Sequence, residues 1–393
     1  MGQRVTVEVE RVAHGGHCVA RHEGQVLFVR HALPGESVEV EVTSLGRKGR
    51  FVRADAVAVL RASPDRRVGP CPVAARCGGC DWQHAIPEAS RRLKSAVVRE
   101  ALLRFAGVTL SGGFEVLEVD GAAGPLASAG LGWRTRGTAS ADGSGRAGFR
   151  AHHSHDVVVA GACPQLHPAL DAVGLFHTVW PPGSRVGFVA PALGTPLAYP
   201  EGSPPSEPVR ERAAGREWAV AADGFWQVHP GAADALVGHV RRMLAPRPGE
   251  RLVDLYAGVG LFGLALADGV PDLAVTLVES DSGACALAEQ NRQGVAAAVV
   301  HAPVHRYVGE PGGLAGADLV VLDPPRTGAG QRVVGAIAAA RPRAIAYVAC
   351  DPVALARDLA TLAGLGYRPA EVVALDLFPT THHVECVAHL VPA

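Results

Sequence analysis

RLVDLYAGVGLFG, residues 251–263, is the stretch that decides the fold of this chain of 393 residues. Its first residues form a short apolar run typical of a buried strand, and the glycines then turn the chain into a helix that begins near Leu264. Gly258 and Gly260 lack the Cβ atoms that would keep a ligand away from the backbone. The stretch therefore predicts a strand, a turn and a helix, with a ligand site at the turn.

An acidic residue after the next predicted strand indicates which class of ligand the turn binds. The next predicted strand, residues 274–278, ends in Glu279, whose carboxylate can accept hydrogen bonds from ribose hydroxyls. The turn has neither the third glycine of a dinucleotide fold nor the Lys-Ser/Thr pair of a P-loop. The strand, the D-x-x-x-G-x-G spacing and the downstream acid match the pattern of S-adenosyl-L-methionine methyltransferases. We therefore expect a Rossmann-like α/β domain over residues 223–393.

Two more predicted strands end at the same crevice. Residues 318–322 lead into Asp323, and the prolines that follow fix the backbone so that its carboxylate points outward. Residues 344–349 lead into Cys350. A buried cysteine is often a packing residue, so the thiol alone decides nothing. Glu385, at the start of the last predicted strand, should lie on the same face, although a carboxylate there could also serve only as an ion-pair partner.

The combination of a thiol and a carboxylate favours one chemistry. An enzyme that methylates nitrogen or oxygen needs no cysteine, because its target already has a lone pair. Carbon 5 of a pyrimidine has none, so a thiolate must first add to carbon 6. A base must then remove the proton from carbon 5. Cys350 and Glu385 beside a cofactor pocket meet both needs.

The N-terminal residues 1–61 are predicted to form a small β-barrel. Val5–Glu10 and Val38–Val42 alternate with period two, and Gly and Pro residues separate them. Such short strands indicate a five-stranded, OB-like barrel, an architecture of nucleic-acid modules. Residues 1–110 hold 17 Lys and Arg against 11 Asp and Glu, although the whole chain has a net charge of −1. Codon bias could also enrich arginine, so charge alone does not decide the partner.

Three cysteines lie within ten residues of each other, at positions 71, 77 and 80. Glycines between the last two permit a tight backbone, so the thiolates can converge on one metal centre. Cys163 is the best candidate for the fourth ligand. Zinc and a 4Fe–4S cluster both accept four thiolates, and the spacing does not choose between them. Cys18, Cys285 and Cys386 have no role that the sequence indicates.

The rest of the chain sets the domain boundaries. Residues 62–222 are expected to form a small α+β central domain that carries the cysteines and ends after a Pro-rich loop. Within it, residues 88–106 have the pattern of an exposed, basic amphipathic helix. The N-terminus has no apolar signal region, and no apolar run is long enough to cross a bilayer. We expect a cytoplasmic monomer with no membrane partner.

Taken in order, these motifs resemble one family. The phrases GHCVAR at residues 16–21 and LFVRHALPGE at residues 27–36 resemble a TRAM domain, which implies an RNA-binding barrel. The whole ordered set, with FWQVHP at residues 225–230, is similar to the class of RNA uracil-5-methyltransferases that carry a TRAM domain and an iron–sulfur cluster. The resemblance covers essentially the whole chain.

The resemblance also implies a role for individual residues. Cys350 is implied as the nucleophile, and Glu385 as the base that removes the proton. The implied contacts of S-adenosyl-L-methionine are Gln227, Tyr256, Glu279 and Asp323, together with the turn at Gly258. The implied ligands of a 4Fe–4S cluster are Cys71, Cys77, Cys80 and Cys163.

Three positions depart from the family pattern. His229 stands where the family usually has Asn, and Leu261 replaces a polar or small residue after the second glycine. Asp351 stands where Asn usually follows the nucleophile. A carboxylate beside Cys350 would raise the pKa of the thiol unless a cation neutralises it, and Arg357 is one candidate for that cation.

Several alternatives remain for the activity. The TRAM domain and the cluster favour 23S ribosomal RNA as the substrate, and a transfer RNA is the alternative. The target uridine should lie in a loop or a single strand, because it must be unstacked to reach the thiol. An RNA cytosine-5-methyltransferase and a non-catalytic RNA-binding protein are the other readings. The former typically has a Thr-Cys segment, whereas Cys350 follows Ala349.

Overall fold

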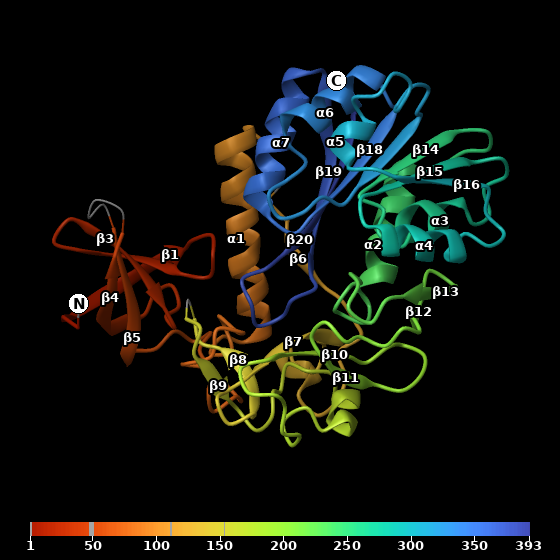
Figure 1. Ribbon diagram of the computed structural model, residues 1–393. Coiled ribbons are helices and arrows are strands. Elements are labelled where there is room, and N and C mark those ends of the chain that lie inside the picture. The colour runs from red at the N-terminus through yellow and green to blue at the C-terminus, as the bar shows by residue number, and fades with distance from the viewer. Residues whose placement is uncertain (1, 47–50, 111, 153) are drawn as a thin grey trace.

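The N-terminal part of the chain is a closed barrel (Figure 1). The structure is a computed structural model that describes residues 2–46, 51–110, 112–152 and 154–393. Alternate valines such as Val7, Val9, Val38 and Val40 point into the barrel and are buried, as the period of two predicted. The strands, in the barrel order β1-β2-β3-β5-β4, are β1 (Arg4–Val12), β2 (Cys18–His22), β3 (Gln25–Arg30), β5 (Val52–Arg61) and β4 (Ser37–Leu45).

The middle of the chain forms a five-stranded antiparallel sheet with its own core. Phe188 and Trp180 are buried in that core. One short 3-10 helix, Ala127–Ala129, precedes the first strand of this sheet, and another, Pro168–Val173, lies between β9 (Val157–Val159) and β10 (Arg185–Val189). A separate hairpin of β12 (Val209–Ala213) and β13 (Arg216–Val220) leads to the C-terminal part. The sheet, in spatial order, consists of β11 (Leu197–Pro200), β10 (Arg185–Val189), β7 (Arg136–Ala141), β8 (Ala147–Arg150) and β9 (Val157–Val159).

The C-terminal part is built on an eight-stranded sheet, which confirms the predicted α/β fold. The strand of the deciding stretch, β14, lies between two parallel neighbours, and its Leu252, Val253 and Leu255 are fully buried. Strand β20 runs antiparallel to the neighbours on both its sides. The order is β16 (Ala297–His301), β15 (Ala274–Glu279), β14 (Arg251–Leu255), β17 (Leu319–Leu322), β18 (Ala344–Ala349), β20 (Glu385–Pro392), β19 (Tyr367–Asp376) and β6 (Val116–Glu118).

Helices cover both faces of this sheet, and each face has its own hydrophobic core. One face is covered by α2 (Ala232–Leu244), α3 (Leu261–Ala267) and α4 (Ser282–Asn291). The other is covered by α1 (Pro87–Ala106), α5 (Val304–Tyr307), α6 (Gly330–Ala340) and α7 (Pro352–Gly364). Among the described residues, no helix combines the length and the apolar character needed to span a membrane.

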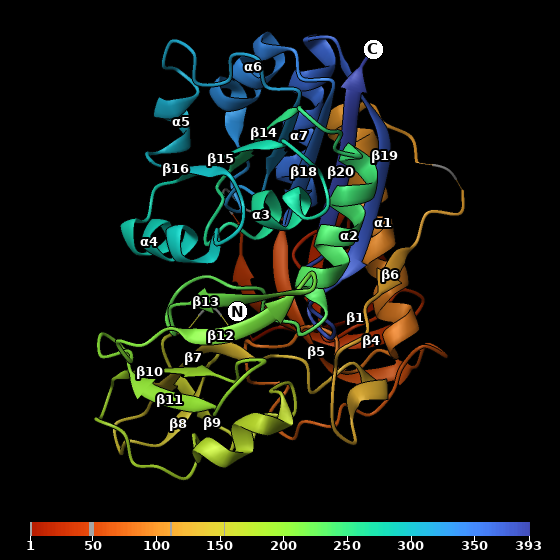
Figure 2. The same ribbon diagram turned by 90° about the vertical axis from the view of Figure 1, so that its right-hand side faces the viewer.

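Helix α1 and strand β6 lie in the predicted central segment, yet they pack on the C-terminal sheet. Residues 374–376 of β19 pair in parallel with β6 at the sheet edge, and Figure 2 shows α1 beside these strands. Val98 and Leu102 of α1 are buried in the same core as α7. The division at residues 61 and 222 therefore remains a prediction, and residues 87–118 contribute to the C-terminal core.

Helix α1 is not the exposed helix that its sequence indicated. Lys94 is completely buried, and its Nζ lies 2.5 Å from Asp376 Oδ1 and donates to the carbonyl of Phe378 at 3.0 Å. A buried charge needs such a partner, because removal from water is costly. The ion pair fastens α1 to the end of β19.

We expect the Lys94→Ala substitution to lower the free energy of unfolding by about 3–5 kcal/mol, because it leaves the buried carboxylate of Asp376 without its partner. Urea unfolding measures the change. The matched control is Arg92→Ala on the same helix, which removes an exposed ion pair with Asp65 and should cost no more than about 1 kcal/mol. Equal losses in the two variants would contradict the assignment.

Candidate active site

The predicted site residues meet at one edge of the large sheet. Strands β15, β14, β17 and β18 are parallel, so their carboxyl ends share this edge. Tyr256, Asp323 and Cys350 directly follow β14, β17 and β18, and Glu279 ends β15. In open α/β sheets, ligands bind at the carboxyl ends of the strands. The structure thus brings these four residues together, and their individual roles remain predictions.

The two glycines of the turn serve different physical needs. Gly258 has a φ of +55°, and a Cβ added there would meet no atom within 4 Å, so the turn faces open space. Gly260 has a φ of +94°, and a Cβ there would lie 2.8 Å from Leu264 Cδ1. Tyr256 also has a positive φ of 64°, which is uncommon and costly for a bulky residue. The left-handed backbone favours glycine at positions 258 and 260, and at Gly260 close packing against the helix excludes a side chain as well.

Glu279 holds the turn as well as facing the crevice. Its Oε2 accepts a hydrogen bond from the Gly258 N–H at 2.9 Å, and its Oε1 accepts from the N–H groups of Ser280 and Asp281 at 2.6 and 2.8 Å. The predicted ribose contact would add to these bonds. Asp254, fully buried within β14, accepts from the N–H of Gly263 at 2.7 Å, and burial raises its pKa to about 8.

Gln227 approaches from the linker before α2 and not from a strand end. It is buried, and the neighbouring carbonyl of Val228 accepts hydrogen bonds from the N–H and the hydroxyl of Thr135, both at 2.9 Å. The departing residue His229 stacks on Trp133, with ring centroids 6.2 Å apart. Burial lowers the pKa of His229 to about 4, so its ring is neutral. His229 thus packs at the junction with the central sheet, and Leu261 is buried in the core.

Cys350 and Glu385 come together through an antiparallel pairing. Strand β18 pairs with β20 in a register that sets Ala349 opposite Cys386. The next pair along this register sets Cys350 opposite Glu385. Glu385 is buried and Cys350 is partly exposed, so the thiol is the more accessible of the two. A thiol and a carboxyl group therefore lie side by side next to the edge where the parallel strands end.

Burial and acidic neighbours keep the protonated forms favoured here. Burial, Glu385 and Asp323 raise the pKa of Cys350 to about 12, and the cation of Arg326 opposes them. Burial raises the pKa of Asp323 to about 7. Burial and then Asp323 also raise the pKa of Glu385 well above its ordinary value, again against Arg326. A cation placed in this crevice would lower the pKa of all three groups.

Asp351 is not the obstacle that the sequence indicated. Its Oδ1 caps helix α7 by accepting from the N–H groups of Val353 and Ala354 at 2.9 and 2.8 Å. Its Oδ2 lies 3.0 Å from Nε2 of His14 in the barrel. Burial would raise the pKa of Asp351, but the hydrogen bonds from His14 and the helix outweigh it and keep that pKa low.

The candidate pairing of Asp351 with Arg357 is therefore wrong. Arg357 lies 5.6 Å from the centre of the Phe105 ring on α1 instead. The hydrogen bond to Asp351 is the main reason that the pKa of His14 is raised, and it outweighs the opposing burial. The carboxylate beside Cys350 is thus shared between a helix N-terminus and a histidine.

The four predicted metal ligands line one cavity. Cys71, Cys77, Cys80 and Cys163 border a space of about 200 Å³ in the central part of the molecule. In the part of the chain that the structure describes, however, no three His, Cys, Asp or Glu side chains converge closely enough to hold a single metal ion. The sequence expectation of a metal centre is therefore not established, although its thiols do share one cavity.

Cys80 has side-chain hydrogen-bond donors on several sides. Gln83 Nε2 lies 3.1 Å from its sulfur, Gln165 Nε2 lies 3.3 Å away, and Thr380 Oγ1 lies 3.7 Å away. A neutral thiol accepts hydrogen bonds only weakly, whereas a thiolate accepts them well. Burial raises the pKa of the Cys80 thiol to about 11 and outweighs the hydrogen bonds from Gln83 and Thr380, which lower that pKa.

Sequence reasoning missed three residues at this site. Arg326 ends the segment DPPR, residues 323–326, and its position shortly after a strand end was a usable signal. His14 contacts Asp351, which lies 337 positions away in the sequence. Asp81 contacts His382, which lies 301 positions away. No local pattern could have indicated these two.

Comparisons with known proteins match both ends of the chain to described domains. Residues 1–57 match the TRAM domain, residues 231–344 the methyltransferase small domain, and residues 316–392 the tRNA (Uracil-5-)-methyltransferase domain. A protein of Streptomyces avermitilis called an uncharacterized RNA methyltransferase is 44% identical, over 100% of this chain and 99% of its own. The 23S rRNA (uracil(1939)-C(5))-methyltransferase RlmD of Pseudomonas putida is 32% identical, over 99% and 94%.

A solved structure has the same architecture along its whole length. The Pyrococcus abyssi tRNA (uracil-54, C5)-methyltransferase, in complex with S-adenosyl-L-homocysteine, superposes with a TM-score of 0.70 and 25% identity. The match covers 99% of this chain and 100% of that one. The chain therefore belongs to the family of RNA uracil-5-methyltransferases with a TRAM domain.

The charges around Cys350 predict its reactivity in the cofactor-free protein. Because the pKa of the thiol is about 12, alkylation by iodoacetamide should rise steadily between about pH 7 and 10 without a plateau. The Glu385→Gln substitution should speed alkylation of Cys350, and Arg326→Gln should slow it. The rate should change by up to about tenfold for each unit by which a substitution moves the pKa of the thiol. Peptide mass spectrometry measures the label, and Cys285 in the same sample is the internal control. A plateau near neutral pH would contradict this assignment.

Proposed function

We propose that the protein methylates carbon 5 of a uridine in 23S ribosomal RNA with S-adenosyl-L-methionine. The observation that carries the proposal is the pairing of β18 with β20, which sets the thiol of Cys350 opposite the carboxylate of Glu385 at the cofactor edge of the sheet. A methyltransferase acting on nitrogen or oxygen needs no such pair.

The proposed reaction assigns one step to each residue. The thiolate of Cys350 adds to carbon 6 of the uracil ring, and the resulting enolate makes carbon 5 nucleophilic. S-adenosyl-L-methionine, when bound, supplies the methyl group. The carboxylate of Glu385 then takes the proton from carbon 5. The electron pair of that bond restores the ring double bond, and the bond between carbon 6 and sulfur breaks.

The proposed cofactor site agrees with the geometry of the sheet edge. Tyr256, Gly258 and Glu279 form the wall at the glycine turn, with Asp323 beside them and Gln227 entering from the linker. The open space at Gly258 leaves room for a ligand close to the backbone. A cationic ligand beside Asp323 would lower the pKa of Cys350. The thiolate would therefore be favoured only while the methyl donor is bound.

The proposed substrate class rests on the barrel and the relatives. Two Pseudomonas relatives, 32% and 33% identical, carry the name of a 23S ribosomal RNA enzyme, whereas the archaeal tRNA enzyme is 25% identical. A uridine in a loop or single strand suits the reaction, because carbon 6 must leave the base stack to meet Cys350. The proposal includes action in the cytoplasm as a single chain.

We also propose that the four cysteines hold a 4Fe–4S cluster. Support comes from the shared cavity of about 200 Å³ and from the donors around Cys80. A site for a single zinc ion needs four ligands converging on one point, and the described side chains do not converge in that way. The larger group therefore suits the cavity better.

Iron analysis tests this assignment. Protein purified without oxygen is expected to contain about four iron and four sulfide atoms per chain, as a 4Fe–4S cluster requires, and Cys163→Ser should lose most of both. Cys285→Ser is the matched control and should keep the full content. About one zinc per chain and no iron would contradict the cluster and favour a zinc site.

Mapping of 5-methyluridine tests the reaction and the substrate together. A deletion strain should lack one 5-methyluridine of 23S ribosomal RNA, and the intact gene should restore it. Cys350→Ala should restore none, because removal of the nucleophile abolishes attack on carbon 6. Cys285→Ala is the matched control and should restore the modification fully. A missing 5-methyluridine in transfer RNA would select the other substrate, and restoration by Cys350→Ala would contradict the mechanism.

A further inference from the structure

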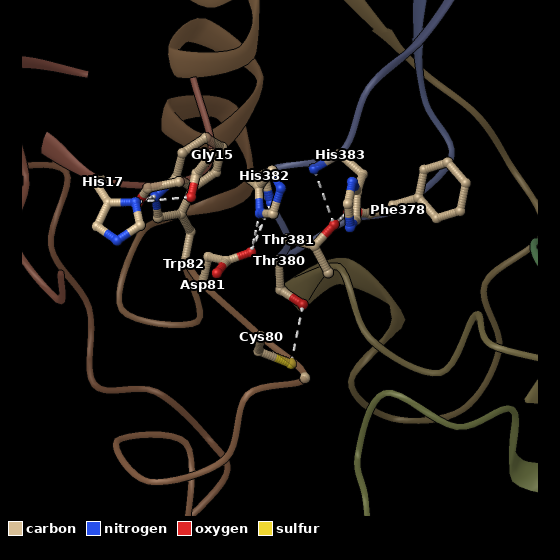
Figure 3. A network of polar contacts seen from close by, with 12 residues as sticks. Gly15, His17, Cys80, Asp81, Trp82, Phe378, Thr380, Thr381, His382 and His383 are labelled. Carbon is tan, nitrogen blue, oxygen red and sulfur yellow. Dashed lines mark hydrogen bonds and ion pairs between the residues drawn. The ribbon is translucent and has the colours of Figure 1, made fainter. Parts of the chain in front are cut away.

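The loop that delivers Glu385 is held by a segment of the cysteine region. Residues 377–384 connect β19 to β20, and Glu385 is the first residue of β20. The carbonyl of Thr380 in this loop accepts two hydrogen bonds, from the N–H of Asp81 at 3.0 Å and from the N–H of Trp82 at 2.9 Å. Figure 3 shows the two segments side by side.

The Asp81 side chain makes a second connection to the loop. Its Oδ2 accepts a hydrogen bond from the backbone N–H of His382 at 3.0 Å and lies 2.7 Å from Nδ1 of the same residue (Figure 3). The Asp81 carboxylate is largely shielded from solvent, with 15% of the side chain exposed. Hydrogen bonds to a charged, shielded acceptor are stronger than ordinary ones. Asp81 is thus a fixed point for the third residue before Glu385.

The held loop contains a strained residue. Thr380 has a φ of 64°, a left-handed conformation that is a genuine outlier for a β-branched residue, and it is buried. Such a conformation persists only where its surroundings enforce it. The two hydrogen bonds from Asp81 and Trp82 provide that constraint, so the loop conformation depends on the cysteine segment.

The barrel supports the same segment from the other side. The indole N–H of Trp82 donates to the carbonyl of Gly16 at 3.0 Å. Gly16 has a φ of +85°, and a Cβ added there would lie 3.1 Å from both Asp81 Cγ and His382 Cβ. The barrel, the cysteine segment and the loop before Glu385 therefore pack together with little spare space.

We propose that Asp81 is a positioning residue for the base: through Thr380 and His382, the segment Cys80–Trp82 keeps Glu385 opposite Cys350. This inference rests on the proposed function. It gives the cysteine site a mechanical role, because Cys80 directly precedes Asp81. That role concerns removal of the proton and not the attack on carbon 6, which belongs to Cys350 at the end of another strand.

A distinct defect follows from this division of roles. If the loop shifts, Cys350 still adds to carbon 6 and carbon 5 still takes the methyl group. The proton on carbon 5 then has no base, so its electron pair cannot restore the double bond and expel the sulfur. The methylated RNA stays covalently attached to Cys350. Accumulation of this adduct with ordinary uridine RNA is the expected signature.

The experiment compares Asp81→Ala with Asp81→Asn in single-turnover reactions on a uridine-containing RNA, and denaturing gels separate the adduct from free RNA. Asp81→Ala is expected to slow release by about 10- to 100-fold, which reaches at most the lower end of the 10²–10⁴-fold that a general base contributes, because the base is displaced and not removed. Asp81→Asn keeps an oxygen acceptor for the His382 N–H and should restore most of the release. Asp65→Asn, an exposed aspartate near the same region, should behave as the wild type.

A second readout separates positioning from folding. Formation of the adduct with 5-fluorouridine RNA needs no proton removal, so Asp81→Ala should form it within about twofold of the wild-type rate. If that variant does not fold, His382→Ala, which removes the partner side chain from the loop, takes its place and should also accumulate the adduct.

Three outcomes overturn the inference or its basis. Normal release of RNA in both Asp81→Ala and His382→Ala would show that the contact between Asp81 and His382 does not position the base. An equal loss of adduct formation with 5-fluorouridine RNA and of release of ordinary RNA would indicate that Asp81 has a general structural role. That outcome would also overturn the inference. Absence of any 5-fluorouridine adduct in the wild-type protein would instead overturn the proposed function itself.

Discussion

The antiparallel pairing of β18 with β20 is the interaction on which the site depends. It places the end of β18 and the beginning of β20 at the same level of the sheet. Cys350 and Glu385 are therefore direct neighbours across the two strands. Parallel pairing of β14 with β15 and β17 brings Glu279 and Asp323 to the same edge. Main-chain hydrogen bonds thus fix the spacing of Cys350, Glu385, Glu279 and Asp323, and rigid strands hold such groups more accurately than loops do.

The charges around Cys350 favour its protonated form in the absence of a ligand. Glu385 and Asp323 raise the pKa of Cys350, and Arg326 only partly opposes them. A thiol held in the protonated form reacts slowly, since the thiolate is the nucleophile. A cationic methyl donor would reverse part of that shift. In the proposed function, the acidic crevice would bind the donor, and the arrival of the donor would favour the thiolate of Cys350.

The barrel and the cysteine region are not separate attachments to the catalytic part. His14 of the barrel lies against Asp351, the residue after Cys350, and Gly16 of the same loop packs on Asp81. Asp81 in turn contacts the loop before Glu385. One short barrel loop thus lies near residues that flank both Cys350 and Glu385, so the barrel, the cysteine region and the C-terminal sheet share a common interface.

By itself the sequence determined the elements and the strand-end residues: the turn at Gly258, the positions of Asp323 and Cys350, and the barrel alternation all depend on local apolar runs, glycines and prolines. It misjudged helix α1 as exposed, and Arg357, its candidate partner for Asp351, was wrong. Only the tertiary structure decided that Lys94 meets Asp376, that His14 meets Asp351 and that Asp81 meets His382. These contacts join residues 282, 337 and 301 positions apart, and no local pattern encodes a pairing over such separations, because the packing of whole elements brings the partners together.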